Sequence, residues 1–272
     1  MPQCLQLLHT FKQNITGGAF EALAAGTGDN LNIPHFQQGS HGNLLEVWGG
    51  NSANACDFDV RSPFFHDNIR GLRMAQMFNP TLSGADGDPQ LLLPSYIRQP
   101  LYRSDTLIPE VNGTATNNVG LDFLMWFDDL EGASQNGYSW DQISGRIKNT
   151  LGVKVSATAG AAGDWGATRA LNQDDDRLKA NTDYAILGAT SQLPALSLSF
   201  IGPETSGRRV GMPLHWSEDQ AGGFFVDMSV KYNQLPCIIV VNANNRGGIL
   251  FQAADPGGAI ATAATIILAE LS

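Results

Sequence analysis

Residues 237–253 read CIIVVNANNRGGILFQA and contain the clearest β signal in the chain. Residues 237–241 are apolar without interruption, which is typical of a strand buried on both faces. Residues 244–248 (NNRGG) have the composition of a turn, and they lead the chain back into a second apolar run at 249–253. The stretch therefore predicts two strands joined by a short connection.

Strand patterns of the same kind recur along most of the chain. They cover residues 45–48, 56–60, 105–111, 119–127, 153–158, 184–190, 196–201 and 260–269. In residues 56–60 the apolar side chains fall on one face and Asp57 and Asp59 on the other, which is the alternation of a strand. We therefore predict an all-β fold, a jelly-roll β-sandwich of one elaborated or two tandem jelly rolls, with antiparallel sheets and two or three short helices. The residues expected in sandwich cores are Phe123, Met125, Ile239, Val241, Ile266 and Leu268.

Two segments show helical spacing instead. In residues 139–151, Ser139 can cap the start, Gly152 can close the end, and the apolar positions Trp140, Ile143, Ile147 and Leu151 recur at helical intervals. A second helix is expected to begin near Ser217, with Glu218 and Asp219 in its first turn, and to stop before Pro236. Its inner face would carry Phe225, Met228 and Tyr232.

The pattern divides the chain into three parts. Residues 1–43 show little periodicity and several glycine breaks, which predicts an N-terminal arm or irregular segment. Residues 44–160 are expected to form a first β-sandwich. Residues 161–272 are expected to form a second β-sandwich or to continue the first, after a small, glycine-rich and acidic connection.

Composition limits the classes of function. The chain has 272 residues, 43% hydrophobic, so it can bury one large β domain or two small ones. Charged residues make up only 15% and the formal charge is −10. Nucleic-acid binding needs clustered Lys and Arg, and the densest basic positions are only the pairs Arg70 with Arg73 and Arg208 with Arg209. We therefore expect no direct binding to nucleic acid, whereas few surface charges make close contact between subunits less costly.

The cysteines and the N-terminal sequence indicate the cellular compartment in which the protein is made. Cys4, Cys56 and Cys237 are odd in number and widely spaced, so reduced thiols are expected rather than a disulfide framework. The first residues lack the basic start and apolar run of a signal peptide. Synthesis in a cytoplasm is therefore expected.

Sequence motifs of catalysis or metal binding are weak or missing. The chain has no Gly-x-Ser-x-Gly elbow, no phosphate loop and no Gly-x-Gly-x-x-Gly. His35 and His41 have no cysteine or carboxylate at a zinc spacing, so they are expected to be surface or capping residues. We expect no catalytic residue, no cofactor site and no metal site.

Three further sets of residues have a functional alternative to the structural one. Asp57 with Asp59, or Asp128 with Asp129, could form an acid/base pair in a groove, but solvated strand edges and turns are the expected state. Asp86, Asp88 and residues 174–176 could offer oxygens to calcium, although they lack the spacing of an EF-hand loop. Trp165 and Trp216 lie near loops and could anchor an interface.

The helix-then-strand blocks at 139–158 and 217–241 and the turn GPETSG at 202–207 carry a resemblance. With many short strands around them, they are similar to the major capsid proteins of tailless icosahedral viruses, including the double jelly-roll kind found in viruses with an internal membrane. The resemblance implies trimers or hexamer-shaped capsomers, no catalytic residues and no required cofactor. Two full jelly rolls need about sixteen strands; the pattern gives fewer, so one roll with insertions and one complete plus one reduced roll both stay open.

The sequence thus predicts a structural virion protein, not an enzyme: a major capsid subunit that self-assembles into an icosahedral shell. The partners expected are copies of itself, other capsid proteins and an internal viral membrane; the location is the virion. Two alternatives stay open: a carbohydrate-binding or glycoside-cleaving β-sandwich, and another self-assembling fibre, spike or cement protein.

Overall fold

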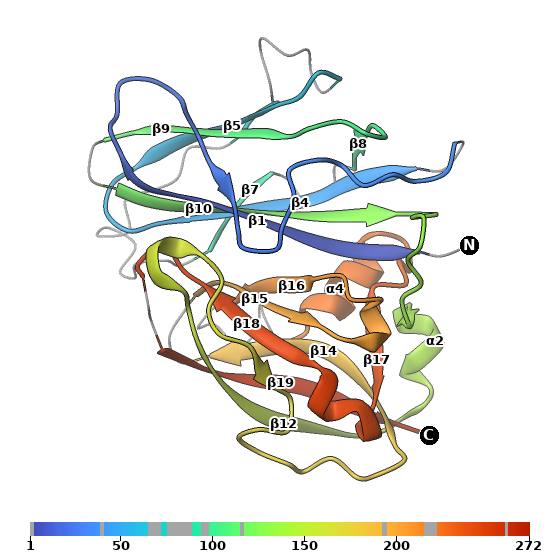
Figure 1. Cartoon of the computed structure of the whole chain (residues 1–272). Coiled ribbons are helices and arrows are strands. Elements are labelled where there is room, and N and C mark those ends of the chain that lie inside the picture. Colours follow the sequence, from blue (N-terminus) through green and yellow to red (C-terminus); the bar gives the residue numbers. More distant parts are fainter. Residues whose placement is uncertain are drawn as a thin grey trace.

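The computed structural model describes residues 3–38, 41–64, 72–74, 89–93, 98–114, 117–191, 195–214, 222–258 and 261–272. The described strands form four antiparallel sheets, called sheets I to IV here, that are stacked in this order from top to bottom of Figure 1. The prediction of an antiparallel, mostly β sandwich with short helices is confirmed.

Sheets I and II form the upper sandwich. Sheet I has the strand order β2 (Glu21–Ala22), β9 (Ile108–Gly113), β5 (Cys56–Arg61) and β6 (Leu72–Arg73). Sheet II has the order β3 (Ala24–Ala25), β1 (Cys4–Ile15), β10 (Asn117–Phe127), β4 (Gly42–Asn51) and β7 (Gln90–Leu93), and β8 (Gln99–Leu101) also pairs with β4. A buried apolar core fills the space between them.

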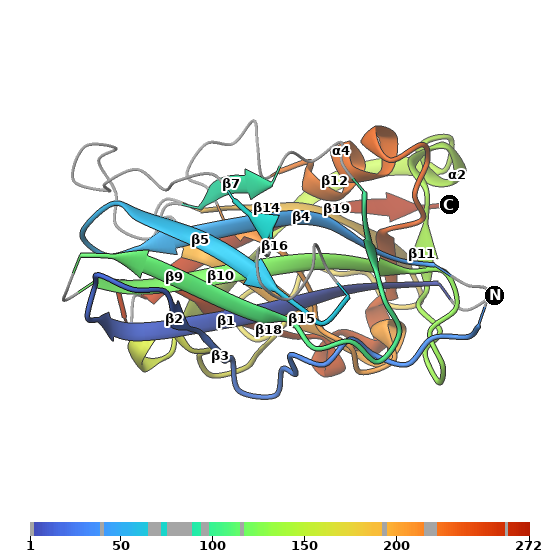
Figure 2. The same ribbon diagram turned by 90° about the horizontal axis from the view of Figure 1, so that it is seen from above.

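Sheets III and IV form the lower sandwich. Sheet III has the order β13 (Arg169–Ala170), β18 (Leu250–Ala254), β15 (Ala195–Ile201) and β16 (Val210–Leu214). Sheet IV has the order β11 (Gly137–Tyr138), β17 (Ile238–Asn242), β14 (Asp183–Ser191), β19 (Ala261–Leu271) and β12 (Ile147–Thr158). The helices are α2 (Trp140–Ser144), α4 (Phe224–Lys231) and the 3-10 turns η1 (Ala161–Gly163), η2 (Pro203–Thr205) and η3 (Ala243–Gly248). Figure 2 shows that β1 begins and β19 ends at the same end of the molecule as α2 and α4.

Sheet II is buried on both faces, so it joins the two sandwiches. Along β10, Phe123 and Met125 face the upper core, whereas Leu124 and Trp126 face the lower one. The contact with sheet III is close at position 120, where the residue is glycine. A Cβ at Gly120 would lie only 2.4 Å from Leu196 Cδ2. The two sandwiches therefore pack directly on one another through sheets II and III.

The predicted irregular arm at residues 1–43 is wrong for residues 4–15. These residues form β1, which pairs antiparallel with β10 from Cys4 to Ile15. Leu5 and Leu7 face the lower core, and Leu8 faces the upper one. Because both faces of β1 are buried, the stretch lacks the alternation by which a half-exposed strand is recognised.

The predicted helix over 139–151 is also corrected. Only Trp140–Ser144 is helical, and the Ser139 N–H donates to Gln142 Oε1 at 2.9 Å at its start. From Ile147 the chain is strand β12, which pairs with β19. Ile143 is fully buried as expected, but Ile147 is only half-buried. The β-branched residues of this stretch favour a strand once β19 is beside it.

The apolar side chains that were expected in the sandwich cores and along α4 are buried. The six expected core residues are all buried: Phe123, Met125, Ile239, Val241, Ile266 and Leu268. Phe225, Met228 and Tyr232 are buried along α4, and residues 217–219 lie outside the described residues. The predicted boundary between the two sandwiches at residue 160 is too late, because β12 (Ile147–Thr158) pairs with β19 and so belongs to the lower sandwich. No helix among the described residues is long and apolar enough to span a bilayer.

Candidate functional site

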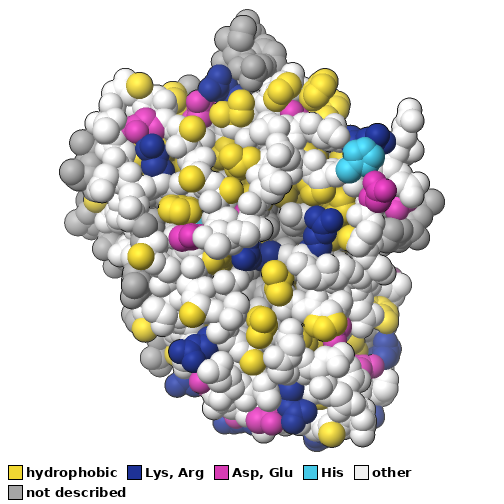
Figure 3. All heavy atoms as spheres, viewed as in Figure 1, with side chains coloured by type: hydrophobic (Ala, Val, Ile, Leu, Met, Phe, Trp, Pro, Cys, Tyr) yellow, Lys and Arg dark blue, Asp and Glu magenta, His cyan; other side chains and the backbone are white. Residues whose placement is uncertain are grey.

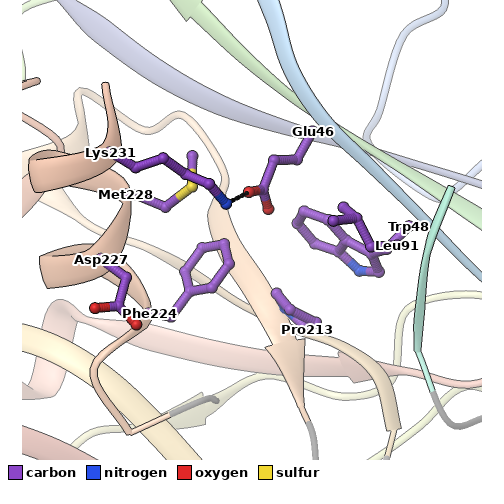
Figure 4. Close-up of a pocket in the computed structure, with 8 residues that line it drawn as sticks. All are labelled: Glu46, Trp48, Leu91, Pro213, Phe224, Asp227, Met228 and Lys231. Carbon is purple, nitrogen blue, oxygen red and sulfur yellow. Dashed lines mark hydrogen bonds and ion pairs between the residues drawn. The ribbon is translucent and has the colours of Figure 1, made fainter. Parts of the chain in front are cut away.

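A pocket of about 340 Å³ lies where α4 of the lower sandwich meets β4 and β7 of the upper one. Figure 4 shows its lining residues: Glu46, Trp48, Leu91, Pro213, Phe224, Asp227, Met228 and Lys231. Four of them come from α4 at intervals of three or four residues, so they share one face of the helix. Glu46 and Trp48 are two apart on β4 and share one face of the strand.

One ion pair lies in this pocket. The Lys231 ammonium is 3.3 Å from Glu46 Oε1. Burial raises the pKa of the Glu46 carboxyl, and the positive charge of Lys231 opposes that rise only in part. Asp227 points away from Glu46 in Figure 4, so the two carboxylates do not face each other across the pocket. An acid/base pair of the glycosidase kind is therefore not formed here.

The aromatic residues of the pocket are fixed by contacts within the protein. The Trp48 indole N–H donates to the Leu196 carbonyl at 3.0 Å, and the Phe224 ring meets Trp48 edge-on at a centroid distance of 6.1 Å. Trp48 is only 1% exposed and therefore offers no flat platform for a sugar ring. The pocket is thus a firm, mostly apolar depression that can receive an apolar group.

A second group of polar residues is buried between sheets II and III. His9 Nδ1 lies 2.7 Å from Asp122 Oδ1, and His9 Nε2 lies 2.6 Å from the Gly163 carbonyl oxygen. Arg209 forms an ion pair with Asp29 and stacks over the Trp165 ring, 4.5 Å from its centroid. We call His9, Asp29, Asp122, Trp165 and Arg209 the junction cluster.

The junction cluster carries a bound proton. Both partners of the His9 ring are acceptors, so the His9–Asp122 pair must supply a proton to each hydrogen bond. Burial lowers the pKa of His9, but the charge and hydrogen bond of Asp122 and the Gly163 carbonyl outweigh burial and raise it. For Asp29, burial raises the pKa although Arg209 opposes it. His9 and Asp122 are paired on neighbouring strands of sheet II and are both 0% exposed, so they do not face a substrate. His9 reaches the lower sandwich through its bond to the Gly163 carbonyl.

The junction cluster is not among the sites that the sequence predicts. His9 and Asp122 are 113 residues apart, and Arg209 and Asp29 are 180 apart, so no local spacing joins them. The available signal was a polar residue inside an otherwise apolar strand. Trp165, expected as a possible interface anchor, is instead 6% exposed and donates from its indole to Asp29 Oδ2 at 2.8 Å.

The predicted acidic loop at 174–176 is tied to its own surroundings. Asp174 accepts from the Ser156 N–H at 2.6 Å, Asp175 pairs with Arg177 at 2.8 Å, and Asp176 pairs with Arg246 at 2.8 Å. No group of three or more metal-ligating side chains occurs in the part of the chain that the structure describes. Asp86, Asp88 and Trp216 lie outside the described residues.

The other predicted candidates are separate from one another. Asp57 and Asp59 lie on β5, where Asp59 is buried and Asp57 half-buried. Asp128 accepts from the Trp126 indole at 3.0 Å and lies 3.5 Å from His41. His35 pairs with Glu131 at the surface, 3.0 Å away. Asp128 and His35 are therefore each held by a neighbouring side chain.

Comparison with known proteins gives no family. No family model and no curated protein match the sequence. Among solved structures, the chain is similar to that of a T=1 Penaeus vannamei nodavirus, with 10% identity, full coverage of both chains and a TM-score of 0.20. The exported protein XepA of PBSX matches at 11% identity and a TM-score of 0.19, over 93% of this chain and 88% of that one. The VP2 subviral particle of infectious bursal disease virus matches at 13% identity and a TM-score of 0.19, over 99% and 72%. These similarities are weak and carry no functional assignment.

Proposed function

We propose that this chain is a structural protein that assembles with copies of itself into the shell of a virus particle. The observation that carries the proposal is the combination of a charge-poor body with large apolar side chains on its surface. Phe64, Leu91, Tyr102 and Val230 are 60%, 51%, 47% and 52% exposed. Exposed apolar groups of this size on a protein with only 15% charged residues are typical of contact surfaces.

Two of these four side chains are in contact with each other. The rings of Phe64 and Tyr102 contact each other on the upper sandwich, with centroids 5.8 Å apart. Leu91 lines the pocket of Figure 4, and Val230 lies on α4, which supplies half of that pocket. Figure 3 shows one face of the molecule, where hydrophobic side chains are scattered over the surface with basic and acidic ones between them. Because only 15% of the residues of the chain are charged, contact with another subunit removes the bound water of few charged groups.

The inside of the protein supports a structural role as well. The ionisable groups with the most unusual surroundings, His9 and Asp122, are sealed between sheets and paired with each other. They lie in the layer where the two sandwiches meet and help to determine how the sandwiches are aligned, which suits the subunit of a shell. In this proposal the subunit is a jelly-roll capsid protein whose partners are copies of itself, other shell proteins and an internal viral membrane.

The proposal is tested by measuring the mass of the purified protein as a function of concentration, with light scattering and electron microscopy. We expect closed oligomers or particles. Leu91→Asp places a charge on the apolar surface and should shift the protein toward the monomer. Ser144→Asp, at an exposed position of α2, is the matched control and should leave the assembly unchanged. A wild-type protein that stays monomeric at high concentration contradicts the proposal.

A further inference from the structure

A polar groove runs along the junction of the two sandwiches, away from the pocket of Figure 4. It consists of two adjoining hollows of about 370 and 290 Å³, and Gln6, Asn30 and Arg208 line both. Gln6 lies on β1 of sheet II, and Arg208 lies just before β16 of sheet III. The Leu7 N–H donates to the Arg209 carbonyl at 2.8 Å, which fixes the two sides of the groove relative to each other.

Arg208 brings an unneutralised positive charge into this groove. Its guanidinium is half-buried, and its hydrogen bond is a long one, 3.4 Å to Gln6 Oε1. Within the described residues it forms no ion pair. Two acids line the same hollows: Asp29 pairs with Arg209, and Glu131 lies 3.0 Å from the exposed His35 ring. A guanidinium has five N–H donors in a planar fork that matches a carboxylate, so most of its donors stay available.

The thiol of Cys4, which is influenced by the charge of Arg208, does not neutralise it. Burial raises the pKa of the Cys4 thiol to about 12, although Arg208 lowers it somewhat. The thiol is therefore uncharged at neutral pH. An external anion is the natural partner for Arg208.

The amide side chains of the groove add further donors. Asn30 Oδ1 accepts from the Asn32 N–H at 3.0 Å, and Asn32 Oδ1 accepts from the Thr106 hydroxyl at 2.7 Å. Both carbonyl oxygens are thus used within the protein, whereas neither NH₂ group donates a hydrogen bond to another described residue, so the free donors of these two groove residues are their NH₂ groups. Gly28 and Gly207, at φ +86° and +68°, line the second hollow without side chains and leave it open. On the face drawn in Figure 3, basic side chains lie at the waist between the two halves.

We propose that this groove binds a small carboxylate that also carries hydroxyl groups, as an acidic sugar does. The carboxylate pairs with the Arg208 guanidinium, and the NH₂ groups of Asn30 and Asn32 donate to oxygens of the sugar ring. The two hollows together hold more than one ring. This binding is separate from the self-assembly proposed above and uses a different surface.

The test is calorimetric titration of the wild-type protein with glucuronate, with uncharged methyl glucoside and with inorganic phosphate. We expect glucuronate to bind, and methyl glucoside and phosphate to bind at least about tenfold more weakly, because each lacks one half of the recognised chemistry. Arg208→Ala should weaken glucuronate binding by roughly tenfold or more. Arg208→Lys should have an intermediate effect, because an ammonium keeps the charge but loses the fork. Arg103→Ala, at an exposed cation elsewhere, is the matched control and should bind as the wild type does.

Each contrary result overturns the proposal. The proposal is wrong if glucuronate does not bind, or if Arg208→Ala leaves the affinity for glucuronate unchanged. Equal affinity for phosphate would show a general anion site, and equal affinity for methyl glucoside would show that the charge has no role. Melting temperatures of both Arg208 variants establish that the fold is intact, and the mass of each variant shows whether assembly is unaffected.

Discussion

The two buried layers on either side of sheet II differ in chemistry. The layer between sheets I and II is filled mainly by apolar side chains such as Leu8, Val47 and Phe123. The layer between sheets II and III combines apolar contacts with the junction cluster, where His9, Asp122, Asp29 and Arg209 are buried and paired.

Because of this difference, one layer mainly stabilises the fold, whereas the other mainly determines how the sheets are aligned. An apolar layer is stabilised by removal of area from water and tolerates small shifts of one sheet over the other. A buried ion pair contributes little net stability compared with apolar groups, but it is costly to break, and it therefore selects one arrangement. We infer that apolar packing holds each sandwich together, whereas the junction cluster sets how the two sandwiches are aligned.

The largest expected effect comes from removing β1, which contributes to both layers. Deleting residues 1–15 removes one of the two strands that pair with β10 and exposes both cores. We expect loss of the cooperative thermal transition and of the β spectrum in circular dichroism. A truncated protein that keeps both would show that β1 is dispensable and would restore the arm predicted from the sequence.

The second-largest effect is expected from breaking the Asp29–Arg209 ion pair in the layer between sheets II and III. Asp29→Asn leaves the guanidinium of Arg209 buried without a counter-charge and should lower the free energy of unfolding by about 3 kcal/mol. Adding Arg209→Met in the same protein should recover much of that loss, because the unpaired charge is then gone. Urea unfolding of the single and double variants measures this. A double variant that is no more stable than Asp29→Asn would contradict the role of the pair.

The junction cluster should also make stability depend on pH. The pKa of His9 is raised in the folded protein above its usual value. Its stabilising contribution is therefore complete below the unfolded-state pKa of about 6.5 and is lost as the pH rises through the folded-state pKa. In the Asp122→Asn variant the charge that raises the pKa is missing, so the loss should move to lower pH. NMR titration of the His9 ring checks the sign, and a pKa below 6.5 in the wild type would refute it.

A smaller effect is expected at the edge of sheet IV. Ile147 is half-buried at the start of β12, which pairs with β19 on one side. Ile147→Ala should lower the free energy of unfolding by about 1 kcal/mol, below the 2–5 kcal/mol typical of a fully buried position. Ile143→Ala, at a fully buried site of α2, is the comparison and should fall in that higher range. Thermal melts that rank the two variants in the opposite order would contradict the structure.

The sequence predicts which segments form strands better than it predicts the side-chain contacts between strands that are far apart in the chain. The runs at 119–127 and 237–241 are apolar on both sides and identify β10 and β17 with their buried residues. The predictions for residues 4–15 and 147–151 are wrong, because β1 is buried on both faces and because Ile147 and Leu151 fit a helical interval, whereas the strand predicted at 153–158 is part of β12. The pairs His9–Asp122 and Asp29–Arg209, and the groove around Arg208, depend on contacts between strands far apart in the chain, which no local pattern contains.

Assembly into a shell can be tested by cryo-electron microscopy of the purified wild-type protein, with its mass measured by light scattering in the same buffer. We expect closed particles or capsomer-like rings whose subunit contacts include Leu91 or the Phe64–Tyr102 pair. A monodisperse monomer at every concentration, with these side chains free in solvent, would contradict it.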